Sequence, residues 1–293
     1  MKLEFYIIDV FAEGKYAGNQ LAVFRNASEL TTEQMLTLAK EINFQESTFI
    51  IHEDEENSIA KVRIFTPELE MVFAGHPTIG TAWIVLNKIF QTSKNKIILD
   101  LPVGNIPVEN NNEILWFTAA KPTFFEIYKR EDISEFTNLQ PSQISPKYPI
   151  QRVSTGSVFF IVPLENTKDL ETLEINLNQL KNWMISRKVD QKFCAFYFFC
   201  EDKNQIKTRM IQVRMLFVEN KVLKEDAATG SAASCLLAYL LEYQKSEIET
   251  TIHQGEYINR PSKIYLKGKK ENENYAIQIG GKVQFIAKGE WEV

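Results

Sequence analysis

Short stretches of alternating apolar and polar residues run along most of this chain, and this period of two predicts strands. The first two are residues 3–11 (LEFYIIDVF) and 20–24 (QLAVF), with glycine-containing turns between them. A helical period replaces the alternation at residues 30–42, where Thr31 and Gln34 have the spacing of a capping box. Further strands are expected at residues 59–66, 96–101, 106–109, 114–119, 157–163 and 192–200, in the second half of 43–52 and in three runs within 260–288, and a further helix at 170–187.

One pattern occurs twice in the chain. Residues 61–82 (KVRIFTPELEMVFAGHPTIGTA) match residues 212–233 (QVRMLFVENKVLKEDAATGSAA) after a shift of 151 positions, with no gap. Each copy has a strand, a short acidic loop, a turn of small residues and an apolar helix, expected at 77–86 and at 229–240. The match predicts a duplicated fold, and a coincidence of common residues is the alternative. The identities are Val62, Arg63, Glu68, Thr78 and Ala82, which recur as Val213, Arg214, Glu219, Thr229 and Ala233.

The order of the elements indicates the fold class. Many short strands with one apolar helix in each half predict an α+β fold, and they differ from the regular alternation of a doubly wound parallel sheet. The polar, proline-containing stretch at 121–149 is the expected crossover between the halves. If the halves face each other, the turns AGHPT and EDAATGS form two sides of one cleft. Each turn opens a helix, whose free N–H groups and positive dipole end suit a carboxylate.

Composition narrows the function classes. The chain has 293 residues, a net charge of −5 and 44% apolar residues, as in an ordinary globular protein. The longest basic cluster is KGKK at 267–270, so nucleic acid is not an expected partner. Neither a membrane span nor a signal peptide is indicated. The three cysteines are too few for a disulfide scaffold, and we expect a cytoplasmic protein.

Several kinds of site find no support in the sequence. The three histidines are widely spaced and no cysteine pair has ligand spacing, so no metal site is expected. The glycine patterns of nucleotide-binding loops and of serine hydrolases are missing. Cys194 and Cys200 share one face of an aromatic strand, where core packing is the expected role.

Acid/base chemistry remains, and three residues are candidates for it. His76 lies at a helix start, and the alternative role is to cap that turn. Asp226 occupies the matching turn of the second copy, although acidic residues are also favoured at helix N-termini for stability alone. Glu46 has apolar neighbours, which should raise the pKa of its carboxyl, and the alternative is an exposed glutamate at a strand start. Thr229 and Ser231 are either helix caps or ligand hydroxyls.

The chain also resembles a known family. The segments DVFAEGKYAGNQLAVF, NFQESTFI, RIFTPELEMVFAGHPTIGTA, STGS, EDAATGSAA and HQGEYINRPSKI are similar to those of the PhzF-like isomerases of phenazine biosynthesis, which share the diaminopimelate-epimerase fold. The matches extend from Asp9 to Gly281 in the family's order. Gln20, Met71, Val72 and Val218 depart from the family's pattern, but none occupies a candidate catalytic position.

This resemblance implies a fold and a site. Two pseudo-symmetric lobes are expected, each a strand-rich half-barrel around a central helix, at residues 1–120 and 121–282, with the strand 283–293 packing back on the first. The resemblance also implies a homodimer, a small carboxylate substrate and no cofactor. The family's acid/base carboxylate, histidine and aspartate fall on Glu46, His76 and Asp226, and its active-site serine on Ser231. Further candidates for substrate binding are Gly75, Thr78, Thr229, Gly230 and Asn19.

The expected reaction is a cofactor-independent isomerisation that moves a proton on a small, possibly cyclic acid. Glu46 would take a proton from one carbon and return it to another. The diaminopimelate epimerases use two opposed cysteines, but the first half of this chain has none, so a two-thiol mechanism is excluded. An epimerase or lyase acting on another small acid, or a binding or scaffold protein of the same fold, are the alternatives.

Overall fold

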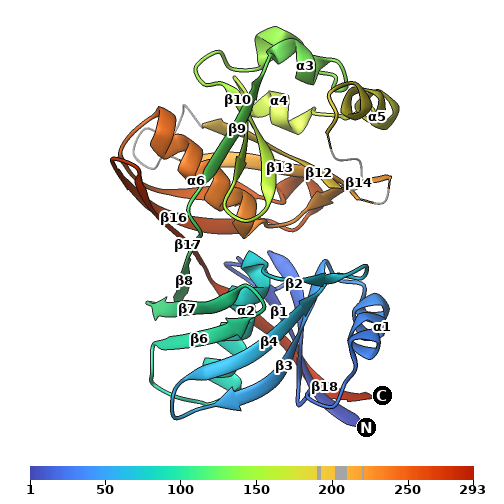
Figure 1. Cartoon of the computed structure of the whole chain (residues 1–293), viewed down its shortest axis with the longest axis vertical. Helices are drawn as coiled ribbons and strands as arrows, with labels where there is room; N and C mark the ends of the chain where they lie inside the picture. The colour runs from blue at the N-terminus through green and yellow to red at the C-terminus, as the bar shows by residue number, and fades with distance from the viewer. Residues whose placement is uncertain (190–192, 202–209, 220) are drawn as a thin grey trace. The chain divides into compact units, whose positions relative to one another are not determined.

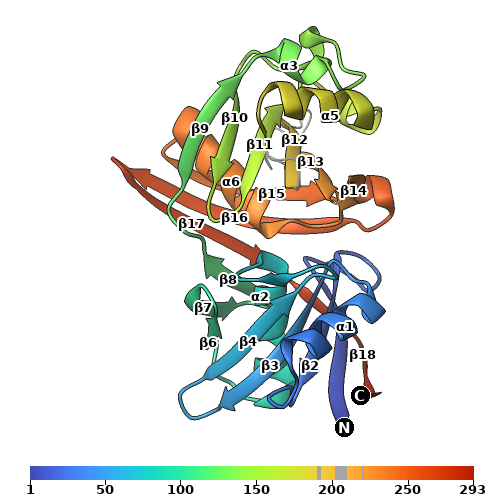
Figure 2. The ribbon, with the colours of Figure 1, turned by 45° about the vertical axis from the view of Figure 1, so that its right-hand side comes forward.

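The computed structural model describes residues 1–189, 193–201, 210–219 and 221–293 and consists of two compact units (Figures 1 and 2). Unit 1 comprises Met1–Thr118 and Gln278–Val293, and unit 2 comprises Ala119–Ile277. Strands predominate in both units, which confirms the predicted α+β class. No helix among the described residues is long and apolar enough to cross a membrane.

A twisted sheet of short strands forms unit 1. The C-terminal strand β18 pairs with β1 along its length, and β1 also pairs with β2. The sheet continues through parallel β2 and β3, antiparallel β3 and β4, and parallel β4 and β6, and then through β7, β8 and the end of β17. The strands are β1 (Lys2–Val10), β2 (Asn19–Arg25), β3 (Glu46–Asp54), β4 (Ile59–Phe65), β5 (Glu70–Met71), β6 (Lys96–Leu101), β7 (Gly104–Asn111), β8 (Ile114–Thr118), β17 (Asn274–Gly281) and β18 (Val283–Glu292).

Helix α2 (Gly75–Ile84) is the centre of unit 1. It contacts β1, β2, β3, β6, β7, β8 and β18, and every residue of the helix except Trp83 is buried. A helix that is apolar on all sides is stable only in such surroundings. It continues in a π-helical turn, η1 (Val85–Ile89). Gly80 allows the close approach to the sheet, because a Cβ atom there would lie 2.6 Å from a methyl carbon of Leu21.

A second helix covers another apolar cluster of unit 1. Helix α1 (Thr32–Ile42) begins with the capping box of Thr31 and Gln34, as predicted. Its buried residues join a cluster in which Phe24 stacks on Phe49 and Trp291 meets Phe24 edge-on. The last strand is therefore part of the core of unit 1, through side chains as well as through its pairing with β1.

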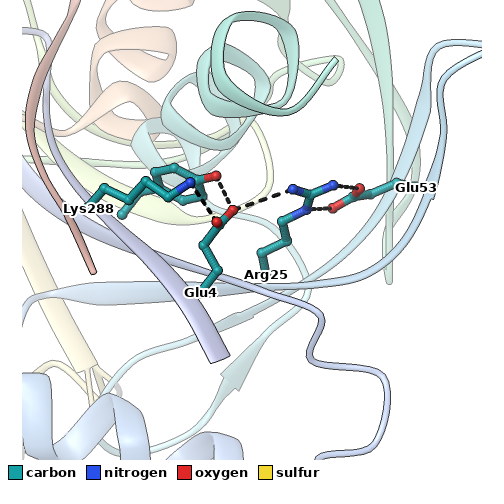
Figure 3. Close-up of polar contacts among 5 residues, drawn as sticks. Glu4, Arg25, Glu53 and Lys288 are labelled. Carbon is teal, nitrogen blue, oxygen red and sulfur yellow. Dashed lines mark hydrogen bonds and ion pairs between the residues drawn. The ribbon is translucent and has the colours of Figure 1, made fainter. Parts of the chain in front are cut away.

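Charged side chains link four neighbouring strands of this sheet (Figure 3). Glu4 of β1 lies between Lys288 of β18, whose Nζ is 2.6 Å from its carboxylate, and Arg25 of β2 at 3.4 Å. Arg25 in turn makes a bidentate contact with Glu53 of β3, at 2.9 and 2.8 Å. These side chains are partly exposed, so each pair contributes little stability alone, but together they favour the observed strand order.

Unit 2 has its own set of strands and its own central helix. Strands β9 to β13 follow one another in the sheet, and β13 pairs with both β14 and β15, the latter leading to β16. Helix α6 (Gly230–Tyr243) contacts β10, β11, β15 and β16 and is almost entirely buried. The strands are β9 (Thr123–Tyr128), β10 (Ile150–Ser154), β11 (Val158–Pro163), β12 (Phe193–Glu201), β13 (Met210–Glu219), β14 (Val222–Asp226), β15 (Glu247–Gln254) and β16 (Ser262–Glu271).

Short helices pack over a second core of unit 2, which is rich in aromatic side chains. Trp183 lies at its centre and contacts Phe136, Phe160 and Phe196. The helices are α3 (Arg130–Ser134), α4 (Thr167–Glu171) and α5 (Leu177–Ser186), with 3-10 turns η2 (Pro141–Gln143) and η3 (Glu256–Ile258) elsewhere in the unit.

Two predicted elements, the helix at 170–187 and the crossover at 121–149, differ from the structure. The helix expected at 170–187 is two helices, α4 and α5, because the side chain of Asn176 accepts hydrogen bonds from Asn178 N and Gln179 N and starts a new helix. The expected strand 192–200 corresponds to β12, and Lys192 lies outside the described residues. The expected crossover 121–149 contains a strand and a helix, β9 and α3.

The two units repeat one order of elements, but the gapless register predicted for the repeat is wrong. In unit 1, Arg63 of β4 makes a bidentate contact with Glu70, seven residues later and five before the start of α2. In unit 2, Arg214 of β13 contacts Glu225 in the same way, but eleven residues later. The second hairpin is therefore longer by four residues. After it, His76 corresponds to Ser231, whereas the gapless match pairs it with Ala227, next to Asp226.

Candidate active site

The unit 1 site gathers at the N-terminus of α2. His76 is the second residue of the helix and is 4% exposed. Its Nδ1 lies 3.5 Å from Oε2 of Glu46, the first residue of β3, and 3.5 Å from Nδ2 of Asn19, the first residue of β2. Because β2 and β3 are parallel and Leu21 is opposite Glu46, both strands begin beside the helix start. Three of the predicted residues therefore meet at one point.

The imidazole of His76 is neutral. Burial lowers the pKa of His76 from 6.5 to about 3, and a backbone hydrogen bond at Gln20 acts weakly in the other direction. The short distance to Glu46 is thus not an ion pair at neutral pH, since the ring carries no charge. No described residue forms a hydrogen bond with the buried Nε2 of this ring. A buried polar atom without a partner costs stability, so a ligand would gain a strong contact there.

A tight turn places Asn19 in this site. Gly18 has a φ of +68°, and a Cβ atom there would lie 2.3 Å from the carbonyl oxygen of Val10, so only glycine fits. The loop before it is fixed by Asp9, which is buried and accepts a hydrogen bond of 2.7 Å from Tyr16 N. The backbone of this loop therefore explains why the segment DVFAEGKYAGN has an aspartate at position 9 and a glycine at position 18.

The other predicted residues of α2 have backbone roles. The hydroxyl of Thr78 donates to the carbonyl oxygen of Ala74 at 2.7 Å, so its proton is committed within the helix. The N-cap residue, Ala74, provides no side-chain cap. The N–H groups of Gly75 and His76 are among those that an α-helix leaves without intrahelical partners, and Pro77 has no N–H.

The unit 2 site gathers at the N-terminus of α6. Asp226 is the last residue of β14, and its Oδ2 accepts a hydrogen bond of 2.5 Å from the hydroxyl of Thr229, the N-cap residue of α6. Gln254 at the end of β15 contacts both residues and also Tyr197 of β12. Sequence reasoning gave Gln254 no role. Its segment, HQG, was recognised, but the 28 residues between Asp226 and Gln254 hide the contact.

The first turn of α6 is held from inside the unit. The hydroxyl of Ser234 donates to the carbonyl of Ser231 at 2.7 Å and lies 2.6 Å from the hydroxyl of Thr155 in the STGS segment. Thr229 makes no side-chain cap bond to α6, and an α-helix leaves its first N–H groups without intrahelical partners. Burial raises the pKa of the nearby Cys235 to about 12, which keeps this thiol protonated.

The site residues thus form two groups, one in each unit: Asn19, Glu46, Gly75, His76 and Thr78 in unit 1, and Asp226, Thr229, Gly230 and Ser231 in unit 2. That both groups act on one substrate stays a prediction. No cluster of three or more potential metal-ligating side chains occurs among the residues that the structure describes.

Comparisons with known proteins identify the family and the enzyme class. The chain is 29% identical to an uncharacterized isomerase of Pasteurella multocida, over 98% of this chain and 93% of that protein. It is 30% identical to the trans-2,3-dihydro-3-hydroxyanthranilate isomerase of Pseudomonas aeruginosa, over 97% of this chain and 98% of that protein. The predicted enzyme class, isomerase, is therefore confirmed.

A solved structure extends the agreement to the fold. The crystal structure of a Bacillus anthracis phenazine biosynthesis protein of the PhzF family matches with a TM-score of 0.86 over 100% of both chains, at 22% identity. The family model described as phenazine biosynthesis-like protein matches residues 8–289. With a match over nearly its whole length, this chain belongs to the phenazine biosynthesis-like (PhzC-PhzF) family.

Proposed function

We propose that this protein is a cofactor-independent isomerase that moves a proton between two carbon atoms of a small carboxylated metabolite. The observation that carries the proposal is the group at the start of α2. There a buried, uncharged imidazole, one nitrogen of which has no hydrogen-bond partner among the described residues, lies beside a carboxylate. Such an arrangement costs stability unless a ligand uses it, and it offers the groups that proton transfer needs.

Glu46 is the proposed acid/base group. As a carboxylate it takes a proton from an activated C–H bond, and as a carboxylic acid it returns that proton to a different carbon. Its side chain is 19% exposed, so the group is sheltered but reachable by a small molecule. The expected rise in the pKa of this carboxyl stays part of the proposal.

His76 is proposed to hold a polar substituent of the substrate through Nε2. A neutral imidazole has one donor and one acceptor, and Nδ1 faces Glu46 and Asn19. The amide of Asn19 can donate to Nδ1, whereas the carboxylate of Glu46 can only accept from it. A change in the protonation of Glu46 therefore favours a different tautomer of His76, which couples the two groups during a proton transfer.

The substrate carboxylate is proposed to bind at the helix N-termini. Neither Ala74 of α2 nor Thr229 of α6, the two N-cap residues, makes a side-chain cap bond. Free N–H groups and the positive end of the helix dipole favour an anion at such a place. Each helix start is proposed as an anion site within its own unit. Gly75 would contribute at α2, and Gly230 and Ser231 at α6, where Asp226 would hold a polar group of the bound molecule.

The relatives suggest a substrate class. The Pseudomonas aeruginosa relative is named for trans-2,3-dihydro-3-hydroxyanthranilate, a partly reduced ring that carries a carboxylate. We propose a cyclic acid of this class for the present chain, and a homodimeric assembly as in the family resemblance.

The test is exchange of substrate protons in D2O, followed by NMR, with trans-2,3-dihydro-3-hydroxyanthranilate and related cyclic and amino-acid-like acids. We expect deuterium incorporation together with a shifted double bond, and a loss of at least about 100-fold in turnover for Glu46→Gln. Exchange with inversion only, or with loss of a group, would indicate an epimerase or a lyase. Binding without exchange would indicate a binding protein and overturn the proposal.

A further inference from the structure

A chain of four buried polar side chains in unit 2 ends at Asp226. Gln254, at the end of β15, is 1% exposed and makes four hydrogen bonds. Its Oε1 accepts from the hydroxyl of Tyr197 at 3.0 Å and from Thr229 N at 3.3 Å. Its Nε2 donates to the carbonyl oxygen of Asp226 at 2.9 Å and to Oγ1 of Thr229 at 2.9 Å. The amide therefore uses all the hydrogen-bonding positions it has.

Two backbone contacts fix the orientation of this amide. The carbonyl of Asp226 can only accept and must face the NH2 group, while the N–H of Thr229 can only donate and must face the oxygen. Turning the amide over would place like groups against each other at both contacts. The orientation of Gln254 is thus determined by the turn that it holds.

The orientation of Gln254 determines the direction of the next hydrogen bond. Because Oγ1 of Thr229 accepts from Gln254, its single proton is directed to Oδ2 of Asp226, at 2.5 Å. A hydroxyl that donates to a carboxylate forms a short, charge-assisted bond of about this length. Asp226 is thereby held as an acceptor in one position.

The same contacts keep Thr229 from capping α6. A threonine at an N-cap position ordinarily accepts a hydrogen bond from the first turn of its helix, but this one makes no such bond. Gly255 supports the arrangement, since it has a φ of +78° and a Cβ atom there would lie 2.6 Å from the carbonyl of Ala227. Only glycine allows the chain after Gln254 to turn so closely against the Asp226–Thr229 segment.

We infer that Gln254 is a positioning residue: it directs the hydroxyl of Thr229 to Asp226 and so fixes the carboxylate that meets the substrate. This inference rests on the proposed function, in which Asp226 contacts the substrate. Gln254 itself touches no reacting atom in this account and acts through Thr229.

The test is Gln254→Glu, which keeps the size and shape of the side chain but removes both donors. Thr229 then loses the donor that sets its direction. We expect kcat for trans-2,3-dihydro-3-hydroxyanthranilate to fall about 10-fold, as for the loss of a hydrogen bond to a charged group, with KM changed by less than about 2-fold.

Gln151→Glu is the matched control. Gln151 is also a buried glutamine of unit 2, accepts a hydrogen bond from the hydroxyl of Tyr243 at 2.8 Å and donates to the carbonyl of Phe125 at 2.9 Å. Tyr243 is the last residue of α6, so the control changes the same chemistry at the other end of the same helix. Both variants should lose thermal stability, but only Gln254→Glu should lose kcat.

A second arm needs no turnover. The side-chain NH2 protons of Gln254, observed by 15N NMR, should exchange slowly with solvent, and Thr229→Val should speed the exchange of one of them by at least about 10-fold. Wild-type turnover with an unchanged kcat in Gln254→Glu would overturn the inference and leave the proposed function standing. A wild-type protein without turnover would instead overturn the proposed function, and equal NH2 exchange in Thr229→Val would then overturn the hydrogen-bond direction as well.

Discussion

The N-termini of α2 and α6 follow the same hairpin of an arginine strand and a glutamate strand, yet their polar surroundings differ. At α2 a buried histidine keeps one nitrogen without a partner among the described residues, and Glu46 and Asn19 stand 3.5 Å from the other. At α6 the second helix residue is Ser231, and Gln254, which contacts the N-cap residue Thr229, has every hydrogen-bonding position filled. A polar atom without a partner, as at α2, is available to bind a ligand, whereas a fully hydrogen-bonded network, as at α6, can hold a carboxylate in one position.

This difference also explains why a duplicated order of elements does not give two equivalent sites. The histidine of α2 and the serine of α6 hold the same helix position, so the polarity of each helix start was set independently of the fold. Asp226 belongs to the strand before the turn, where it faces Met215 across the hairpin. The two halves share an architecture for presenting N–H groups and differ in the side chains next to them.

The largest expected effect concerns the two hairpins. Arg214 and Glu225 are 12% and 10% exposed, and Arg214 also donates to the carbonyls of Leu170 and Leu173. Arg63 and Glu70 are 25% and 31% exposed. We expect Arg214→Met to lower the free energy of unfolding by about 3 kcal/mol, because it leaves a buried carboxylate unpaired. Arg63→Met should cost about 1 kcal/mol or less.

Urea denaturation of both variants measures this contrast. Equal losses of unfolding free energy would contradict this expectation. They would show that the two ion pairs stabilise the protein alike and that the contact of Arg214 with Leu170 of α4 adds nothing.

A smaller effect is expected in the pH dependence of stability. In the unfolded chain the pKa of His76 is near 6.5, and in the folded protein it is about 3. Between these values the unfolded state binds one more proton, so this residue lowers stability by about 1.4 kcal/mol for each unit that the pH falls below 6.5. His76→Asn should remove that contribution.

The measurement is the free energy of unfolding of the wild type and His76→Asn between about pH 4.5 and 7.5, where groups common to both proteins cancel in the difference. The difference should change with the stated slope below pH 6.5 and stay constant above it. A difference that is constant throughout would contradict a buried, neutral imidazole at α2.

Much of this account could be predicted from the sequence, and the exceptions have physical reasons. The α2 segment was found because its residues are apolar on all sides and because glycine, histidine and proline mark its start. The predicted register of the repeat is wrong because the second hairpin is longer by four residues. The two copies have a similar composition, so the sequence alone does not reveal this insertion. The role of Gln254 could not be seen, since a glutamine in a strand end becomes informative only when the fold brings it to Thr229 and Asp226.

Strand β9 was missed for a different reason. Its sequence, TFFEIY, lacks the apolar–polar alternation that identifies a strand with one face in the core. In agreement with this, Phe124, Phe125 and Ile127 are at most partly buried. Pairing with β10, and not burial, defines it.

The contrast between the two helix starts is tested most directly by measuring substrate C–H exchange in D2O for Glu46→Gln and Asp226→Asn side by side, with trans-2,3-dihydro-3-hydroxyanthranilate at saturating concentration. If the chemistry belongs to the α2 group and the α6 group positions the substrate, Glu46→Gln should lose at least about 100-fold in exchange rate and Asp226→Asn about 10-fold. A loss in Asp226→Asn as large as that in Glu46→Gln would contradict this division of roles.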